Sequence, residues 1–447
     1  MSGASSNGGA ARRAEPIVVS AEMGYGHLRA ALPIAEALGT EVVHADRAPL
    51  ADPDEQRLWA RVRRVQELLS KPVQMASWLG DPTQLMDRVT NIPPLYARPD
   101  FSQPNLGAQV LDFLASRGLG RGLVRHLKET GAPLITTFYA PAIIADRAGC
   151  ESVYCVATDA DINRVWAPLE GRHSRVRYFA PSARVVRRLV SYGVPREHVT
   201  LTGFPLPLEL LGNQELSVLR RTVARRIVRL DRRGVFRELH RDDLQRAFGP
   251  LPTHEEGQPP AITFAVGGAG AQAEMAFDFL PSLRAAIYSK HLTVNLVAGT
   301  RRDVAETFAQ AIRKAGLDSA VGAGIRVLKA PDFSTYYRRF NELLLETDIL
   351  WTKPSELSFY AALGLPIVLA KPVGSHERFN RRWLRELGVA LKQDSVRHAA
   401  QWLEEWLEDG TYRILAAVRG DAASSAQRDA TSGDDASLRG PSGQFPH

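Results

Sequence analysis

Residues 16–32, PIVVSAEMGYGHLRAAL, join an apolar run to a segment with helical spacing through Gly24, Gly26 and His27. Glycine permits the positive φ angles of a tight strand-to-helix turn. Because Pro33 lies inside the apolar pattern that follows, we expect a short or kinked first helix. The stretch predicts a strand, a turn and a helix, and by itself it assigns no role to His27.

Short apolar runs alternate with helical segments along most of the chain. In the first half the runs are PIVVSA (16–21), EVVHA (41–45), PLITTF (133–138), SVYCVAT (152–158) and VRYFAP (176–181). In the second half they are AITFAVGG (261–268), LTVNLVAG (292–299), IRVLKA (325–330), DILWTK (348–353) and LPIVLAK (365–371). Such alternation is typical of parallel sheets covered on both faces. We therefore predict an α/β protein with two Rossmann-like, doubly wound parallel-sheet domains.

The length of 447 residues and the apolar content of 45% are sufficient for two such cores. We place an N-terminal domain at residues 16–205, a basic linker or insertion at 206–258, and a C-terminal domain at 259–419. Residues 1–15 and 420–447 are small and polar, and they lack the apolar content that repays ordering. Both ends are therefore predicted to be disordered.

The net charge of +7 suits an anionic partner, such as a nucleotide diphosphate or an acidic membrane face. Residues 218–246 contain ten arginines and four acids. Two interpretations remain open: a solvated helical insertion, or a contact with anionic lipid or substrate. In another basic stretch, residues 58–80, aromatic residues are not interleaved with basic ones as a stacking platform for nucleic acid requires, so a nucleic-acid partner is not expected.

The expected location is the cytoplasm, and peripheral contact with the inner face of the membrane is an open alternative. The two cysteines, Cys150 and Cys155, lie on a predicted buried strand and have no metal-ligand spacing, which favours a reducing compartment. Residues 1–15 lack the apolar core of a signal peptide and no run approaches the roughly 20 apolar residues that span a bilayer, so we expect a soluble or peripheral protein. Residues 58–80 mix tryptophans and leucines with basic residues, so this segment either lies in an anionic membrane interface or packs on its own domain.

A second glycine loop follows the first strand of the second half. In FAVGGAGAQAEM (264–275), Gly267, Gly268 and Gly270 precede a helix that we expect from Ala271 onward. Backbone N–H groups and the positive end of a helix dipole there can bind a diphosphate. The pattern is not G-x-G-x-x-G and no acid is placed to hold an NAD ribose, which argues against a dehydrogenase.

Six motifs occur in the order of one family. They are GYGH (24–27), ATDADINRVWAP (157–168), RYFAPSARVVRRLVSYGVPREHVTLTGFPL (177–206), VGGAGAQ (266–272), TKPSELSFYAALGLPIVLAKP (352–372) and GSHERFN (374–380). On these motifs the chain resembles GT-B glycosyltransferases, in the group of monogalactosyldiacylglycerol synthases, processive diacylglycerol glucosyltransferases and the lipid II-forming N-acetylglucosaminyltransferase. The resemblance covers residues 16–205 and 260–395.

The resemblance implies that two domains face each other across a cleft. It further implies an inverting transfer of a sugar from a nucleotide diphosphate sugar, UDP-linked, to a hydroxyl of a lipid-like acceptor, with no metal ion and no cofactor. Two other functions remain open on the same fold: a nucleotide-sugar epimerase, and a catalytically silent protein that binds a nucleotide sugar.

For the acceptor side, the resemblance places His27 near the acceptor as a base or phosphate contact. Imidazole titrates near neutral pH and can take a proton from a hydroxyl, although a simple helix cap is the alternative. Asp159 is the second candidate base. Gly24, Gly26, Thr158 and Trp166 are the other acceptor-side residues. The sequence DAD at 159–161 also imitates a D-x-D motif, which would hold Mg²⁺ with a diphosphate.

For the donor side, relatives commonly read K-P-G-G-L-T-x-S-E-A, and this chain is two residues shorter before GLP (364–366). The position of the ribose-binding glutamate falls on Phe359, so either Glu356 substitutes from one turn earlier or the contact is lost. His376 stands where a glutamine is common. The implied donor-binding residues are Gly267, Gly268, Gly270, Gln272, Phe333, Lys353, Ser355, Glu356, Ser358, His376, Glu377 and Asn380.

Overall fold

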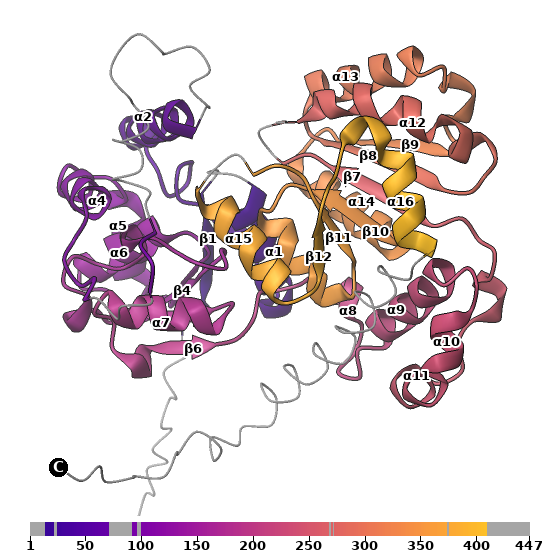
Figure 1. Ribbon diagram of the computed structural model, residues 1–447. Coiled ribbons are helices and arrows are strands. Elements are labelled where there is room, and N and C mark those ends of the chain that lie inside the picture. Colours follow the sequence, from indigo (N-terminus) through magenta and orange to yellow (C-terminus); the bar gives the residue numbers. More distant parts are fainter. Residues whose placement is uncertain are drawn as a thin grey trace, which may run out of the picture. The chain divides into compact units, whose positions relative to one another are not determined.

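The computed structural model describes residues 14–21, 25–70, 92–95, 100–267, 270, 272–372 and 375–408 (Figure 1). The described side chains do not include those of residues 62–70, 375 and 376. The chain forms two compact units that divide between Pro205 and Leu206. Each unit contains one six-stranded sheet in which all strand pairs are parallel. The prediction of an α/β protein with two Rossmann-like domains is confirmed.

The first unit is built on a sheet of strand order β2-β1-β3-β4-β5-β6. Its strands are β1 (Ile17–Ser20), β2 (Val42–His44), β3 (Leu134–Thr136), β4 (Val153–Val156), β5 (Arg177–Ala180) and β6 (Val199–Leu201). Its helices are α1 (Tyr25–Leu38), α2 (Pro53–Ser70), α4 (Leu106–Ser116), α5 (Arg121–Thr130), α6 (Tyr139–Arg147) and α7 (Ala183–Ser191). The inner strands are almost continuously apolar because helices cover both faces of a doubly wound sheet.

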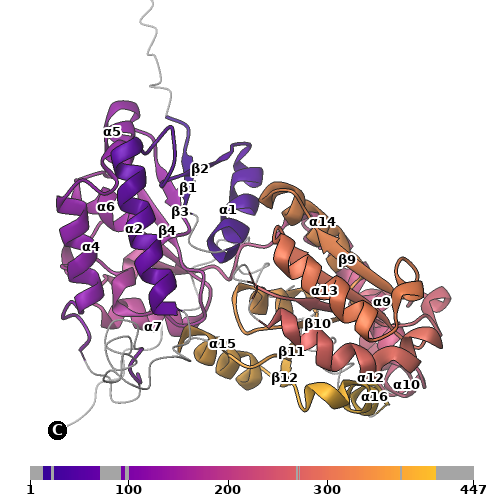
Figure 2. The ribbon, with the colours of Figure 1, turned by 90° about the horizontal axis from the view of Figure 1, so that it is seen from above.

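The second unit has the strand order β12-β11-β10-β7-β8-β9. Its strands are β7 (Ala261–Ala265), β8 (Thr293–Gly299), β9 (Ile325–Lys329), β10 (Ile349–Thr352), β11 (Ile367–Leu369) and β12 (Ala390–Lys392). Its helices are α8 (Leu208–Leu211), α9 (Ser217–Leu230), α10 (Val235–Leu239), α11 (Arg241–Phe248), α12 (Ala276–Tyr288), α13 (Arg302–Lys314), α14 (Phe333–Glu346), α15 (Ser375–Glu386) and α16 (Ala399–Glu408). Helices α12 and α13 lie side by side (Figures 1 and 2).

Two strands, β6 and β12, were not expected from the sequence. Each is the last strand at one edge of its sheet. Thr200, Leu201 and Lys392 are exposed in these strands, so neither has the continuous apolar pattern of an inner strand. An edge strand pairs on one side only and needs less apolar cover, which explains why the apolar runs did not reveal it.

Helix α1 runs through Pro33 to Leu38, so of the two expectations for this helix the short length is wrong and the kink stays a prediction. A proline inside a helix removes one hydrogen bond and costs about 3 kcal/mol. Ala31 and Ala35 are buried in a cluster with Val18 of β1. This packing against the sheet offsets the cost of the proline and keeps the helix in place.

Each sheet has one point at which the strand order reverses its direction. In the first unit this point lies between β1 and β3, and in the second unit it lies between β7 and β10. In open α/β sheets, ligands bind outside the carboxyl ends of the strands at such a point. Both glycine loops follow the first strand at these points, so the topology places candidate sites there.

The basic segment 218–246 forms α9, α10 and α11 of the second unit. Arg226 is buried, and its guanidinium donates to the backbone oxygens of Thr347, Leu363 and Gly364 at 2.9 to 3.2 Å. Burial lowers the pKa of Arg226 to about 9. Ion pairs within the unit engage Arg225, Arg229, Arg233, Arg237, Arg241 and Arg246. These contacts favour the interpretation of the segment as a structural insertion.

The segment 58–80 begins inside α2. Trp59 is only 3% exposed and its Nε1 donates to Glu55 at 3.4 Å, so this tryptophan belongs to the core of the first unit. Residues 71–80, including Trp78, lie outside the described residues. Among the residues that the structure describes, no helix is long and apolar enough to cross a membrane. For Trp59, packing on its own domain is the correct alternative.

Candidate functional site

His27 lies in the first turn of α1, and the end of β3 fixes its ring. Its Nδ1 lies 2.7 Å from the backbone oxygen of Thr137, while the Thr137 hydroxyl donates to the backbone oxygen of His27 at 2.8 Å. A carbonyl oxygen only accepts, so Nδ1 holds the hydrogen and Nε2 is the basic nitrogen of the neutral ring. The contact joins the first turn of α1 to the residue after β3 and is not a cap of α1.

Two other predicted acceptor-side residues surround the same imidazole. Thr158 follows β4, and its Oγ1 lies 3.2 Å from Nδ1 of His27. The ring of Trp166, which is 5% exposed, lies 6.3 Å from the imidazole between centroids. Phe138, which the sequence did not single out, lies closer, at 4.8 Å. Gly26 precedes His27 in the first turn of α1, and Gly24 lies outside the described residues.

The two acids of the DAD sequence have different surroundings. Asp159, directly after Thr158, is half-buried. Asp161 is buried, and Arg188 binds both of its oxygens at 2.9 Å while Arg184 donates to Oδ2 at 2.7 Å. Since arginines already occupy the Asp161 carboxylate, the pair does not offer Mg²⁺ the two carboxylates of a D-x-D site. Asp161 has a structural role, and Asp159 remains the candidate base of the two.

In the second unit, three elements meet at the ends of β7 and β10. Lys353 follows β10, and its Nζ lies 2.6 Å from Oε1 of Glu377 in the first turn of α15. A Cβ atom on Gly267 would lie 2.4 Å from Cε of Lys353, a distance that no real side chain tolerates. A larger residue at position 267 would therefore push the flexible lysine side chain aside, which shows that this side chain lies directly against the loop backbone.

The turn after β10 presents two hydroxyls with unusual surroundings. Ser355 and Ser358 are buried, and neither side-chain oxygen has a hydrogen-bond partner in the part of the chain that is described. Leaving a buried hydroxyl unpaired costs about 1–3 kcal/mol. Asn380 of α15 is fully buried and its amide donates to the backbone oxygen of Pro354 at 3.4 Å, which holds this turn. Both serine hydroxyls are thus buried next to Lys353 and Pro354 without a partner among the described residues.

The glycine loop also contacts the segments that follow β8 and β11. A Cβ atom on Gly270 would lie 3.1 Å from Nε of Arg301, a residue that the sequence did not single out. Gln272 has a positive φ of 75° and its amide donates to the backbone oxygen of Lys371 at 2.6 Å. Gly268 and Ala271 lie outside the described residues. The helical segment begins as a 3₁₀ turn at Ala273, two residues after the expected start.

Phe333, Glu356 and His376 complete the predicted donor residues. Phe333 begins α14, where its ring packs on Tyr336 and Tyr337. Glu356 is half-buried at the start of the 3₁₀ turn Glu356–Leu363. His376 lies in α15, and its side chain is not described. Ribose binding by Glu356 stays a prediction.

Phe359 occupies the position at which relatives have the ribose-binding glutamate. It is 3% exposed, and its ring lies 5.2 Å from that of Trp383. Residues three apart in a 3₁₀ helix lie on the same face, so Glu356 and Phe359 share one face of this turn. The position is apolar and packed, and it cannot contribute a hydrogen bond to a ribose.

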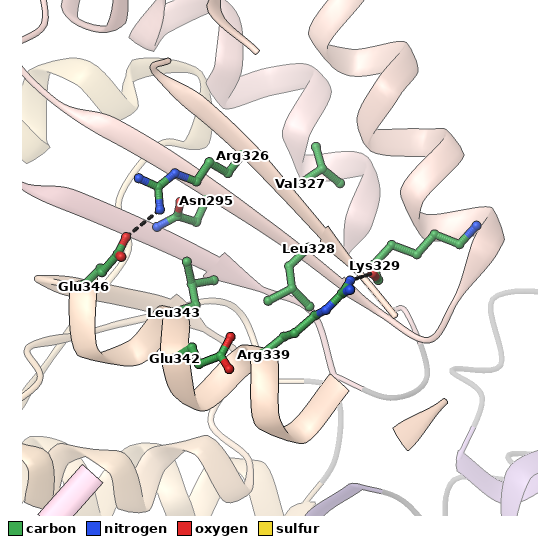
Figure 3. A pocket seen from close by; sticks show the side chains of 9 residues that line it. All are labelled: Asn295, Arg326, Val327, Leu328, Lys329, Arg339, Glu342, Leu343 and Glu346. Atoms are coloured by element: carbon green, nitrogen blue, oxygen red, sulfur yellow. Dashed lines mark hydrogen bonds and ion pairs between the residues drawn. The ribbon is translucent and has the colours of Figure 1, made fainter. Parts of the chain in front are cut away.

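Two cavities lie elsewhere on the second unit. One, of about 300 Å³, lies between β9 and α14, where Arg326 pairs with Glu346 and Arg339 donates to the backbone of Lys329 (Figure 3). The other, of about 490 Å³, is lined by Arg220, Arg221, Phe248 and Pro250 among others. Neither cavity contains a residue that the sequence predicted for the site. The candidate site thus rests on the contacts at the strand ends.

Residues 317–419 match the model of a family described as a domain of unknown function (DUF6938). A search of the curated proteins found no significant match to the sequence.

Among solved structures, the chain is similar to the UDP-GlcNAc 2-epimerase of Neisseria meningitidis bound to UDP-GlcNAc. The identity is 11%, the alignment covers 93% of this chain and 97% of that one, and the TM-score is 0.48. It is also similar to UGT89C1 of Arabidopsis thaliana complexed with UDP-L-rhamnose (14% identity, 93% and 96% coverage, TM-score 0.48). A third is MurG of Acinetobacter baumannii (15% identity, 93% and 98% coverage, TM-score 0.44). The identities and TM-scores are low, so a function must be inferred from the side chains of this chain.

Proposed function

We propose that the protein is an inverting glycosyltransferase that moves a sugar from a UDP-linked donor to a hydroxyl of a lipid-like acceptor, without a metal ion or cofactor. The observation that supports this best is the fixed imidazole of His27, whose Nδ1 donates to the backbone of Thr137 at the end of β3. This bond selects the tautomer with a basic Nε2 and stabilises the ring once it is protonated. The order of the six motifs supports the assignment to this class.

In the proposed reaction, Nε2 of His27 takes the proton of the acceptor hydroxyl as its oxygen attacks the anomeric carbon. The bond from that carbon to the diphosphate oxygen breaks, and the diphosphate leaves with the electron pair. Attack from the face opposite the leaving group inverts the anomeric configuration. Asp159 is the alternative base, and Trp166 and Phe138 form the walls beside the imidazole.

The second unit holds the donor in this proposal. The backbone at Gly267 and Gly270 and the ammonium of Lys353 bind the diphosphate and stabilise the charge that develops on it, which is the electrostatic part of catalysis. The hydroxyls of Ser355 and Ser358, which lack protein partners in the described residues, bind the nucleotide. Glu377 and Asn380 bind hydroxyls of the donor sugar.

The acceptor and the location follow from the resemblance alone. A lipid-like acceptor places the enzyme in the cytoplasm, in peripheral contact with the inner face of the membrane. One observation favours the silent alternative instead: the packed ring of Phe359 stands where a ribose-binding glutamate is usual. A protein that binds the donor without turning it over would tolerate this change.

Binding of UDP is expected to raise the melting temperature of the full chain. A ligand that binds only the folded state stabilises it by about 2.7 kcal/mol at 100 times its Kd. A thermal shift series with UDP, GDP, ADP and dTDP measures this, with uridine as the control for the contribution of the diphosphate. If no nucleotide shifts the transition at millimolar concentration, the donor-binding proposal fails.

A further inference from the structure

We infer that Lys353 and Arg301 form a clamp of two cations around the donor's diphosphate, and that the diphosphate displaces Glu377 and Asp303 from them. The inference rests on the proposed function, because it specifies how that donor site recognises its ligand. It assigns a role to Arg301, which lies outside all six motifs. In this inference, the phosphates bind where the carboxylates of Glu377 and Asp303 lie in the structure.

The sheet topology places the two cations on either side of the glycine loop. β7 lies between β10 and β8, and all three strands are parallel. Lys353 is the first residue after β10, and Arg301 is the second residue after β8. The loop that starts at Gly267 leaves β7 between them. A ligand above this loop therefore has a cation on each side.

The glycines show that both side chains reach the loop itself. A Cβ atom at position 267 would meet Cε of Lys353 at 2.4 Å and its Nζ at 3.2 Å. A Cβ atom at position 270 would meet Nε of Arg301 at 3.1 Å. Gly267 thus lies directly against Lys353, whereas Gly270 lies against Arg301 and, at 2.7 Å, against Cγ2 of Val304. A diphosphate has one phosphate for each cation, and phosphate oxygens match the donors of both guanidinium and ammonium groups.

Each cation is paired with a carboxylate in the structure. Nζ of Lys353 binds Oε1 of Glu377 at 2.6 Å, and Nε of Arg301 binds Oδ1 of Asp303 at 3.0 Å. The two pairs differ in exposure, because Glu377 is 2% exposed whereas the side chain of Asp303 is 64% exposed. A buried counter-ion competes strongly with a phosphate, whereas a solvated one competes weakly.

Because Glu377 and Asp303 differ in exposure, neutralising each of them is expected to change pyrophosphate affinity to a different extent. Glu377→Gln keeps the shape of the side chain but removes its charge, so Lys353 becomes available to the ligand. Pyrophosphate affinity is then expected to rise by roughly tenfold. Asp303→Asn removes a solvated competitor, and the expected rise is at most about fivefold. Using pyrophosphate and UDP, which contain no donor sugar, separates this effect from the loss of sugar contacts at Glu377.

Removal of either cation is expected to weaken binding. Lys353→Met and Arg301→Met should each reduce the affinity for pyrophosphate and for UDP by roughly 10- to 100-fold, as for the loss of one charged hydrogen bond. Arg302→Met is the matched control, since Arg302 is the neighbour of Arg301 but pairs with Glu306 and its side chain is 83% exposed. The double variant Lys353→Met with Glu377→Gln removes both charges of this ion pair. Its melting temperature without ligand shows whether the fold is intact.

Isothermal titration calorimetry of the full chain with pyrophosphate and with UDP decides the outcome. Weaker binding in both cation variants, with tighter binding in Glu377→Gln, is the expected result. If the wild type binds neither ligand, the proposed function itself fails. If the wild type binds UDP but folded Lys353→Met and Arg301→Met bind it equally well, the clamp is wrong while the proposed function stands. Weaker pyrophosphate binding by Glu377→Gln would overturn the role of Glu377 as a competitor.

Discussion

Replacement of His27 by alanine is expected to lower the rate of glycosyl transfer by roughly 10²- to 10⁴-fold, which is the usual effect of losing a general base. UDP affinity should stay unchanged, since the proposed donor residues all belong to the second unit. Turnover at saturating donor and acceptor, with UDP affinity measured separately by calorimetry, tests both parts. The physical reason is that the Nδ1 contact with Thr137 leaves Nε2 as the basic nitrogen.

Two further variants make this test specific. His173→Ala removes a histidine of the same unit whose side chain is 82% exposed and paired with Glu170, and it should leave turnover unchanged. Asp159→Asn keeps the shape of the second candidate base and deletes its charge. If Asp159→Asn loses the rate while His27→Ala changes only the acceptor KM, Asp159 is the base. Near-normal turnover in both variants would contradict the acceptor site altogether.

Replacement of Asp161 by asparagine is expected to destabilise the first unit by about 3–5 kcal/mol, because it leaves a buried cation without its counter-charge. Arg188 is fully buried, and its contacts at 2.9 Å with both oxygens of Asp161 are its only ion pair in the described residues. Its guanidinium also lies 5.9 Å from the ring of Tyr192, which cannot replace a full charge. Urea denaturation measures the change in the free energy of unfolding.

The matched control is Asp112→Asn, which breaks a pair with Arg147 at 2.7 Å on the surface of the same unit. An exposed pair of this kind contributes about 0–1 kcal/mol. A loss below 1 kcal/mol for Asp161→Asn would show that the pair with Arg188 does not stabilise the unit, and would reopen the D-x-D interpretation.

The inner strands and the two glycine loops were predictable because they follow from the periodicity of the residues themselves. An inner strand of a doubly wound sheet must be apolar on both faces, so Ile262 or Val368 is visible as part of an apolar run. An edge strand need not be apolar on both faces, as the exposed residues Thr200 in β6 and Lys392 in β12 show. The length of α1 was mispredicted because the packing of Ala31 and Ala35 outweighs the local effect of Pro33.

Residues of the candidate site were predictable only where the type of side chain indicates a chemical role. His27, Thr158 and Trp166 were singled out from the motifs, and the structure places them around one imidazole. The key partner of His27 is a backbone oxygen, which every residue has, so no residue type could mark Thr137 in advance. Arg301 was missed because its relation to Gly270 comes from the pairing of β7 with β8, about thirty residues later in the chain.

The central claim is that the protein transfers a sugar from a nucleotide diphosphate donor to a lipid-like hydroxyl with inversion. Proton NMR of the anomeric region tests it most directly, during incubation of the full chain with a panel of UDP-sugars and a membrane lipid extract. The expected result is release of UDP together with a new glycoside whose anomeric configuration is inverted. A donor sugar that changes its configuration while it stays attached to UDP would identify an epimerase, and a donor that binds but remains unchanged with every acceptor would contradict enzymatic transfer.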